Sequence, residues 1–231
     1  MSRGHAGLAL AVLAVAAIAA GGLFGASLFS GDAPTAPPSA VSWRTEIPAG
    51  FSMEAGLPTD ADAGPREASD DPATPWTLDL CGSTDSPSDG SRAAFRQVSQ
   101  TAPAARHVRQ IALFADAEAA RAVVDGFRRR LADCPRVRVP EGGFPGEDLT
   151  IRWEERPYSA GEEALVAIAY AEGFTLASHH AVVRVGNAVY AQTYDGEFGM
   201  SGEAADATDR AARAIADRIA AGMCVFAAEG C

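Results

Sequence analysis

The chain has 231 residues and a formal net charge of −11 at pH 7. This length predicts one folded domain with appended segments. The negative charge disfavours contact with phosphate backbones and anionic lipid headgroups, so we expect no nucleic-acid partner. All 19 basic residues are arginines, which we interpret as a composition bias rather than as chemistry.

The first element is an uncharged segment at residues 7–29. As a helix its 23 residues could cross a hydrocarbon core of about 30 Å. Arg3 precedes the segment, so the positive-inside rule places residues 1–6 in the cytoplasm and the rest outside. A cleaved secretion signal is the alternative, with a possible cleavage site at 17–19. The chain after residue 30 is therefore expected either on the outer face of the cell membrane or secreted.

Residues 30–75 read as an extracellular tether rich in proline and acids. They contain eight prolines, and eight acids against two arginines, so they cannot bury enough apolar surface to fold alone. The stretch WRTEIPAGFSMEAGLP at 43–58 is an exception. Its large apolar residues favour docking on the folded domain as an irregular arm.

The folded domain is expected at residues 76–231, beginning near Trp76. Alternating apolar residues predict a half-buried strand at 76–80. Further strands are predicted by similar patterns in the segments 93–100, 106–114, 149–156 and 163–172, and in a hairpin at 179–194. The second of these strands follows a turn at Ala102-Pro103.

Two amphipathic helices complete the domain. The apolar spacing of 116–134 predicts a helix with Asp116 as its N-cap, and 203–224 predicts a second. Arg128–Arg130 lie in the last turns of the first helix, where cations suit the helix dipole. We interpret them as a solvated polar face rather than as an anion-binding patch. The fold class is therefore α+β: a mostly antiparallel sheet of five to seven strands, packed with two helices and stabilised by disulfides.

All four cysteines lie in the exported part, at Cys81, Cys134, Cys224 and Cys231. An even number outside the cell indicates disulfides, and three pairings are possible. We favour Cys81–Cys134 and Cys224–Cys231, the second closing the short loop CVFAAEGC. A catalytic thiolate is disfavoured because no cysteine lies in a CxxC motif or beside a histidine in the sequence.

The hairpin HHAVVRVGNAVYAQTY turns at Gly186-Asn187, a pair typical of a two-residue turn with positive φ. This register places Val185 opposite Ala188 and His179 opposite Tyr194. His179 and His180 then leave opposite faces of the strand, so they cannot bind one metal ion together. We expect no metal and no cofactor.

Motifs for catalysis are absent from the sequence: it has no GxSxG, no HExxH and no P-loop. The glycine-rich EGGFPGED at 141–148 carries acids that would repel a phosphate. No catalytic residue is assigned, and the chain is not expected to be an enzyme.

Several pieces together resemble the extracellular sensor domain of PknH-type actinobacterial serine/threonine kinases. They are Cys81-Gly82, the run RQIALFADAEAARAVVDGFRRRLADCP, the hairpin VVRVGNAVY and a terminal helix ending in cysteines. The resemblance covers about residues 76–231. It implies an α+β fold, two intramolecular disulfides, a cleft for an unidentified ligand and no catalytic residues. With only residues 1–6 before the anchor, we expect no signalling through a kinase of its own.

These observations favour a non-catalytic, membrane-tethered extracellular domain that binds an unidentified small ligand or cell-envelope component. The expected site is an apolar cleft against the sheet, bordered by Tyr170, Arg184, Tyr190 and Tyr194. A protein–protein interaction module of the envelope is the alternative, and it predicts an exposed apolar patch instead. A secreted hydrolase is the third hypothesis, and it requires clustered acids or a Ser/His pair in one pocket.

Overall fold

The computed structural model describes residues 41–59, 62–78, 89–144, 147–198 and 202–231, without side-chain detail at 141–144 and 147. One compact unit runs from Ala40 to Cys231. The predicted membrane segment at 7–29 and Cys81 lie outside the described residues. In the part of the chain that is described, no helix combines the length and the apolar character needed to span a membrane.

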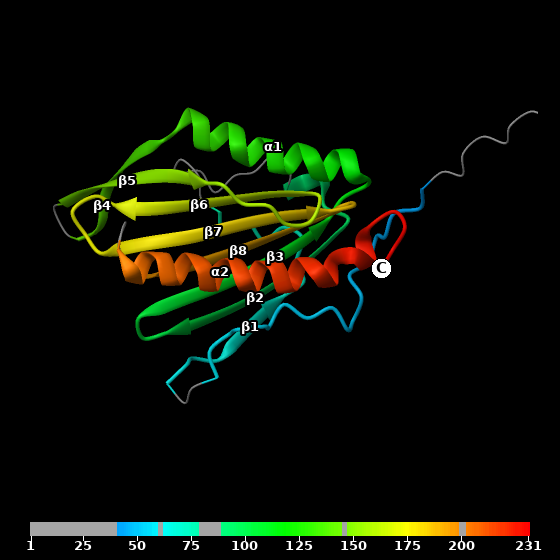
Figure 1. Ribbon diagram of the computed structural model, residues 1–231, viewed down its shortest axis with the longest axis horizontal. Coiled ribbons are helices and arrows are strands. Elements are labelled where there is room, and N and C mark those ends of the chain that lie inside the picture. The colour runs from blue at the N-terminus through cyan, green and yellow to red at the C-terminus, as the bar shows by residue number, and fades with distance from the viewer. Residues whose placement is uncertain (1–40, 60–61, 79–88, 145–146, 199–201) are drawn as a thin grey trace, which may run out of the picture. The chain divides into compact units, whose positions relative to one another are not determined.

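Eight strands within the described residues form one antiparallel sheet in the order β1-β2-β3-β8-β7-β6-β5-β4 (Figure 1). The strands are β1 (Arg66–Ser69), β2 (Ala94–Ala102), β3 (Ala105–Leu113), β4 (Arg136–Phe144), β5 (Glu147–Arg156), β6 (Glu163–Ala171), β7 (Leu176–Val185) and β8 (Ala188–Glu197). The expected five to seven strands were too few. The additional strands, β1 and β4, are the two edges of the sheet. Their short or Pro/Gly-containing sequences are tolerated there because an edge strand leaves part of its ladder unpaired.

The expected strand at 76–80 is also corrected. Residues 76–78 are described and are not a strand. The backbone N–H of Thr77 donates instead to the side-chain oxygen of Gln110, at 2.8 Å. Trp76 and Leu78 are nevertheless buried, so the apolar alternation predicted burial correctly but not the backbone pairing.

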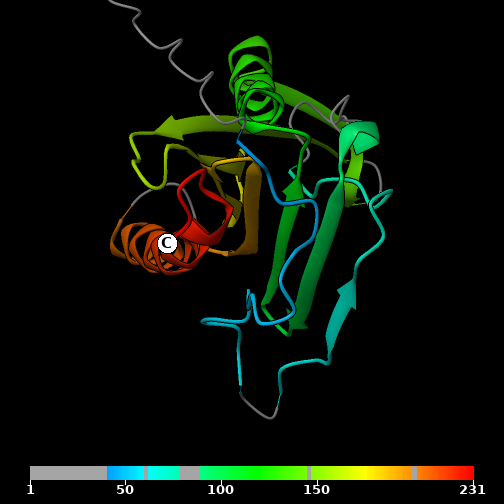
Figure 2. The same cartoon turned by 90° about the vertical axis from the view of Figure 1, so that its right-hand side faces the viewer.

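The two helices cover opposite faces of the sheet, with α1 and α2 separated by the strands in both views (Figures 1 and 2). Helix α1 (Ala117–Asp133) begins after Asp116, whose carboxylate accepts from the N–H of Ala119. It packs on Leu165, Val182 and Val189. Helix α2 (Glu203–Gly222) packs on the alternate residues of the same strands, such as Val166 and Val183. The core is therefore two apolar layers, one on each face of the sheet.

The central hairpin has the predicted register. Val185 pairs with Ala188, and His179 pairs with Tyr194. Gly186 has φ of 56°, as the two-residue turn requires. Asn187 is buried and its amide donates to the carbonyls of Phe114, at 2.6 Å, and Arg44, at 2.7 Å. The turn thus joins the end of β3 to the N-terminal arm.

The arm at 43–58 docks on the α2 side of the sheet, as its large apolar residues predicted. The described part of 30–75 is therefore not an extended tether throughout. Met53 and Leu57 belong to the core beneath α2. Arg109 donates to the carbonyl of Met53, and β1 pairs with β2 further along. The compact unit therefore begins well before the expected boundary at Trp76.

The disulfide between Cys224 and Cys231 is present, with Cα atoms 4.7 Å apart. It closes the short loop after the turn of 3-10 helix Met223–Phe226. Cys134 is also disulfide-bonded. Its expected partner, Cys81, lies outside the described residues, so that pairing stays a prediction.

Candidate functional site

The four residues expected to border a cleft do not form one site. Strand alternation places Tyr170, Tyr190 and Tyr194 on the face covered by α2, and Arg184 on the face covered by α1. Tyr170 and Tyr190 are fully buried in the core. The expected cluster of Tyr170, Arg184, Tyr190 and Tyr194 is therefore wrong as a single cleft, although Tyr194 borders a cavity of its own.

Arg184 has a structural role. Its guanidinium is paired with Glu162 at 2.6 Å and with Glu163 at 3.1 Å, and it donates to the carbonyl of Gly186 at 3.0 Å. These contacts satisfy the charge and tie the hairpin turn to the start of β6. Arg184 lines neither the cavity beside Trp153 nor the one beside Tyr194.

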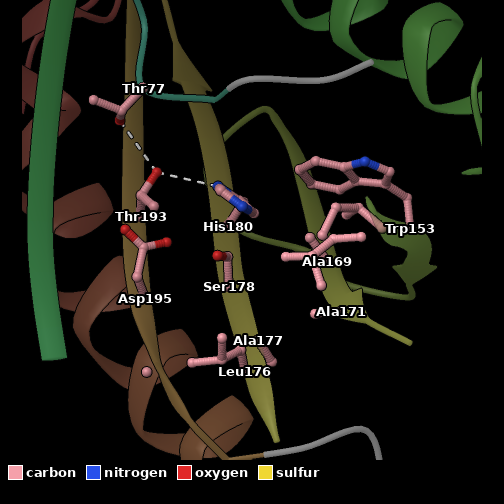
Figure 3. A pocket seen from close by; sticks show the side chains of 13 residues that line it. Thr77, Trp153, Ala169, Ala171, Leu176, Ala177, Ser178, His180, Thr193 and Asp195 are labelled. Carbon is pink, nitrogen blue, oxygen red and sulfur yellow. Dashed lines mark hydrogen bonds between the residues drawn. The ribbon is translucent and has the colours of Figure 1, made fainter. Parts of the chain in front are cut away.

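A cavity of about 390 Å³ lies on the α1 face of the sheet, beyond the strand positions that α1 covers (Figure 3). Small side chains on β6 and β7 leave this space open, and Trp153 of β5 forms one wall. The lining residues are Thr77, Leu149, Ile151, Trp153, Ala169, Ala171, Leu176, Ala177, Ser178, His180, Thr193, Asp195 and Gly196. The cavity is therefore mostly apolar with a few polar groups, as small-molecule sites commonly are.

A chain of hydrogen bonds runs along the polar side of this cavity. The hydroxyls of Thr77 and Thr193 are 3.2 Å apart, and that of Thr193 is 3.1 Å from Nδ1 of His180 (Figure 3). The Thr77 hydroxyl in turn reaches Oε1 of Gln110 at 3.1 Å. The orientation of the Gln110 amide is settled by two backbone groups, because Oε1 accepts from the N–H of Thr77 and Nε2 donates to the carbonyl of Pro75.

This chain determines the tautomer of His180. Each hydroxyl has one hydrogen, and Oε1 of Gln110 can only accept. All three bonds form together only if Thr77 donates to Gln110, Thr193 donates to Thr77, and His180 donates from Nδ1 to Thr193. Nε2 of His180 is then an unprotonated acceptor.

His180 Nε2 is buried and has no hydrogen-bond partner among the described residues. Burial, with a smaller effect of the neighbouring His179, lowers the pKa of His180 to about 3, so the ring stays neutral near pH 7. The ring of Trp153 lies 5.1 Å from that of His180. The site thus has one unpartnered acceptor buried in the wall of an apolar cavity.

The adjacent His179 is on the other face and is bonded differently. Its Nε2 donates to the carboxylate of Asp209 on α2 at 2.8 Å, and Asp209 also accepts from Arg213. His179 is fully buried and lines neither the cavity beside Trp153 nor the one beside Tyr194. This pair therefore anchors α2 to β7 rather than facing a substrate.

Ser178, His180 and Asp195 line the first cavity together, but the hydrogen bond of His180 goes to Thr193. His179, on the opposite face, bonds to Asp209. No group of three or more His, Cys, Asp or Glu side chains among the described residues is placed to hold a metal ion.

A second cavity, of about 260 Å³, lies on the α2 face. It is bounded by β3, β8, α2 and Gly56 of the arm. Its lining residues are Gly56, His107, Arg109, Gln192, Thr193, Tyr194, Thr208, Ala211, Ala212 and Ile215. The buried Arg109 makes it chemically unlike the first cavity.

The sequence pattern contained part of the first site. Strand alternation alone put His180 and Thr193 on one face, but nothing indicated that Thr77 and Gln110 would complete the chain. Trp153 was placed correctly on a strand, yet its neighbour His180 became visible only when β5 and β7 were placed on either side of β6. These partners come from distant segments and have no local signal.

Comparison with known proteins gives little independent support. No family model matches the chain. No curated protein matches it either. The extracellular domain of PknH from Mycobacterium tuberculosis is similar in structure, with 16% sequence identity, a TM-score of 0.47, and coverage of 68% of this chain and 83% of that one. A likeness this weak carries no conclusion about family or function.

Proposed function

We propose that residues 40–231 form a non-catalytic, extracytoplasmic binding domain for a small, mostly apolar molecule that carries a hydrogen-bond donor. The observation that carries this proposal is the cavity beside Trp153, where buried Nε2 of His180 has no partner among the described residues. A buried acceptor left unsatisfied costs about 1–3 kcal/mol. A ligand hydroxyl or N–H would recover that free energy.

The proposed location outside the cytoplasm rests on two observations. Cys224 and Cys231 form a disulfide and Cys134 is disulfide-bonded, which is typical of oxidising compartments. The uncharged segment 7–29 is suited to export, either as an anchor or as a cleaved signal.

The interaction-module alternative has less support. It predicts a contiguous exposed apolar patch. The large apolar side chains exposed among the described residues are Val41, Phe174 and Leu176, and Leu176 borders the cavity itself. An apolar residue at the rim fits a ligand entrance.

The test uses a matched pair of probes, 2-naphthol and 2-methoxynaphthalene, which differ in whether the oxygen can donate. Isothermal titration calorimetry on residues 40–231 should give about tenfold tighter binding of the naphthol, because only its hydroxyl can donate to His180 Nε2. His180→Phe should remove this preference. Equal affinities for both probes in the wild type would contradict the donor requirement, and binding of neither would contradict the site.

A second variant separates the tautomer from simple loss of the ring. In Thr193→Val the Nδ1–H of His180 loses its acceptor, so the proton can move to Nε2 and donate to the methoxy oxygen. The two probes should then bind with about equal affinity, although His180 is still present. Thr101→Val, an exposed change on β2, is the matched control and should keep the wild-type preference.

A further inference from the structure

Arg109 on β3 is a buried guanidinium with too few partners. Its side chain points to the α2 face, and the residue is 2% exposed. Its hydrogen bond among the described residues goes to the carbonyl of Met53. No carboxylate within the described part of the chain lies within ion-pair distance of it. A guanidinium has five N–H donors, so one neutral acceptor leaves most of them and the whole charge uncompensated.

Arg184 provides an internal comparison. It is equally buried, also 2% exposed, but it is paired with Glu162 and Glu163 and donates to a carbonyl as well. Buried charges in proteins are normally paired in this way because desolvation is costly. Arg109 departs from the pattern that the same chain follows on the opposite face.

The surroundings of Arg109 increase its need for an anion. Burial lowers the pKa of its guanidinium, and the nearby Arg218 and Arg66 lower it further, against the opposing effects of Tyr190 and Glu54. Arg218 therefore adds positive charge nearby, whereas Arg66 is itself paired with Glu54 at 2.5 Å.

Arg109 faces a cavity large enough for a small organic anion. The cavity of about 260 Å³ is lined by polar groups of His107 and Tyr194 from the sheet and by Thr208, Ala212 and Ile215 of α2. Burial lowers the pKa of His107, and Arg109 lowers it further, so that ring is neutral at pH 7. The charge at this cavity is thus supplied by Arg109.

We propose that this cavity is a second binding site, for a small carboxylate whose oxygens pair with the Arg109 guanidinium. The planar guanidinium matches a carboxylate with two parallel N–H···O bonds, which are among the strong hydrogen bonds in proteins. The apolar residues of α2 would contact the hydrocarbon part of the ligand. The site is on the opposite face of the sheet from the cavity of His180, and Thr193 is the one residue that the two linings share.

The probe is 4-fluorobenzoate, with 4-fluorobenzamide as its uncharged counterpart. Fluorine NMR titration of the purified full chain in detergent, with protein-free micelles as blank, should give a Kd on the order of 1 mM for the carboxylate. The amide should bind at least tenfold more weakly. Carboxylate affinity no greater than that of the amide would overturn the proposal.

Variants test whether the charge of Arg109 binds the carboxylate. Arg109→Gln retains an N–H donor for the Met53 carbonyl but removes the charge, and it should weaken benzoate binding at least tenfold. Arg106→Gln, an exposed arginine on the same strand, should change it less than twofold. Unchanged binding in Arg109→Gln would refute the role of Arg109.

A thermal readout covers the case in which a variant folds poorly. Benzoate should raise the unfolding temperature of the wild type and of Arg109→Lys, which keeps the charge, but not that of Arg109→Gln. A benzoate-dependent increase of the same size in Arg109→Gln would refute the site even if affinities could not be compared.

Discussion

Two adjacent histidines hold opposite tautomers in this fold. His179 carries its proton on Nε2 and donates to Asp209, whereas the hydrogen-bond chain places the proton of His180 on Nδ1. The backbone alternation of β7 separates them, since neighbouring side chains on a strand point to opposite faces. One of the pair therefore stabilises the packing of α2, and the other keeps an unpartnered acceptor in the wall of a cavity.

Gly186 is required at the hairpin turn for two reasons. Its φ is 56°, and a Cβ atom there would lie 1.9 Å from the carbonyl oxygen of Phe226. Gly173 has φ of 87° with nothing within 4 Å of such an atom. Both glycines therefore have a positive φ, but only Gly186 also lies this close to another part of the backbone.

Replacing each of these glycines by alanine separates the two effects. Gly173→Ala should cost about 1 kcal/mol, the cost of the positive φ alone. Gly186→Ala should cost about 3 kcal/mol or more, because the backbone of the C-terminal loop must move. Urea unfolding measures both. Equal losses would show that the contact with Phe226 relaxes without cost.

At the scale of elements, the N-terminal arm behaves as part of the domain. Met53 is buried between α2 and the sheet, and Phe51 packs edge-on against Phe226 with ring centroids 5.3 Å apart. Arg44 donates to the carbonyl of Val225 at 2.8 Å. The arm therefore covers the α2-side core and contacts the C-terminal loop as well.

Truncating Met53 tests whether the arm contributes to global stability. Met53→Ala should lower the free energy of unfolding by about 3 kcal/mol, the usual cost of a large-to-small change in a core. Val41→Ala, at a residue 49% exposed, is the control and should change it by less than about 0.5 kcal/mol. A loss below 1 kcal/mol for Met53→Ala would mean that the arm detaches independently of the domain.

At the scale of the whole molecule, buried histidines make stability depend on pH. Burial lowers the pKa of His107, His179 and His180 below 6.5. Between pH 6.5 and the lowered pKa of each histidine, the unfolded protein therefore binds protons that the folded protein does not bind. Burial raises the pKa of Asp209, but hydrogen bonds from Arg213 and His179 outweigh it and hold the value below 3.8. That carboxylate affects stability only in strong acid.

The folded state should thus lose stability as the pH falls from 7.5 to 5. The expected slope is up to about 1.4 kcal/mol per pH unit for each histidine kept neutral. Urea unfolding at the two pH values measures the loss. His180→Phe should reduce the slope by about 1.4 kcal/mol per pH unit, because one fewer proton is taken up on unfolding. Stability that is unchanged or greater at pH 5 would contradict the burial of neutral histidines.

Because His180 stays neutral down to about pH 3, naphthol binding should be the same at pH 5.5 and 7.5.

Features with a local cause were readable from the sequence. The hairpin register followed from Gly186-Asn187, the start of α1 followed from Asp116, and strand alternation placed His179 and His180 on opposite faces. Each depends on steric preferences or hydrogen bonds within a few residues. The class α+β and the antiparallel pairing followed from the same patterns.

The tertiary structure alone decided which distant residues meet. It put Tyr170 and Tyr190 in the core, gave Arg184 its two glutamates, and left Arg109 without a carboxylate among the described residues. These outcomes depend on strand order and on the docking of segments far apart in the chain, so no local pattern carries them. Edge strands β1 and β4 escaped prediction for the same reason, since long-range contacts stabilise sequences with weak local preferences.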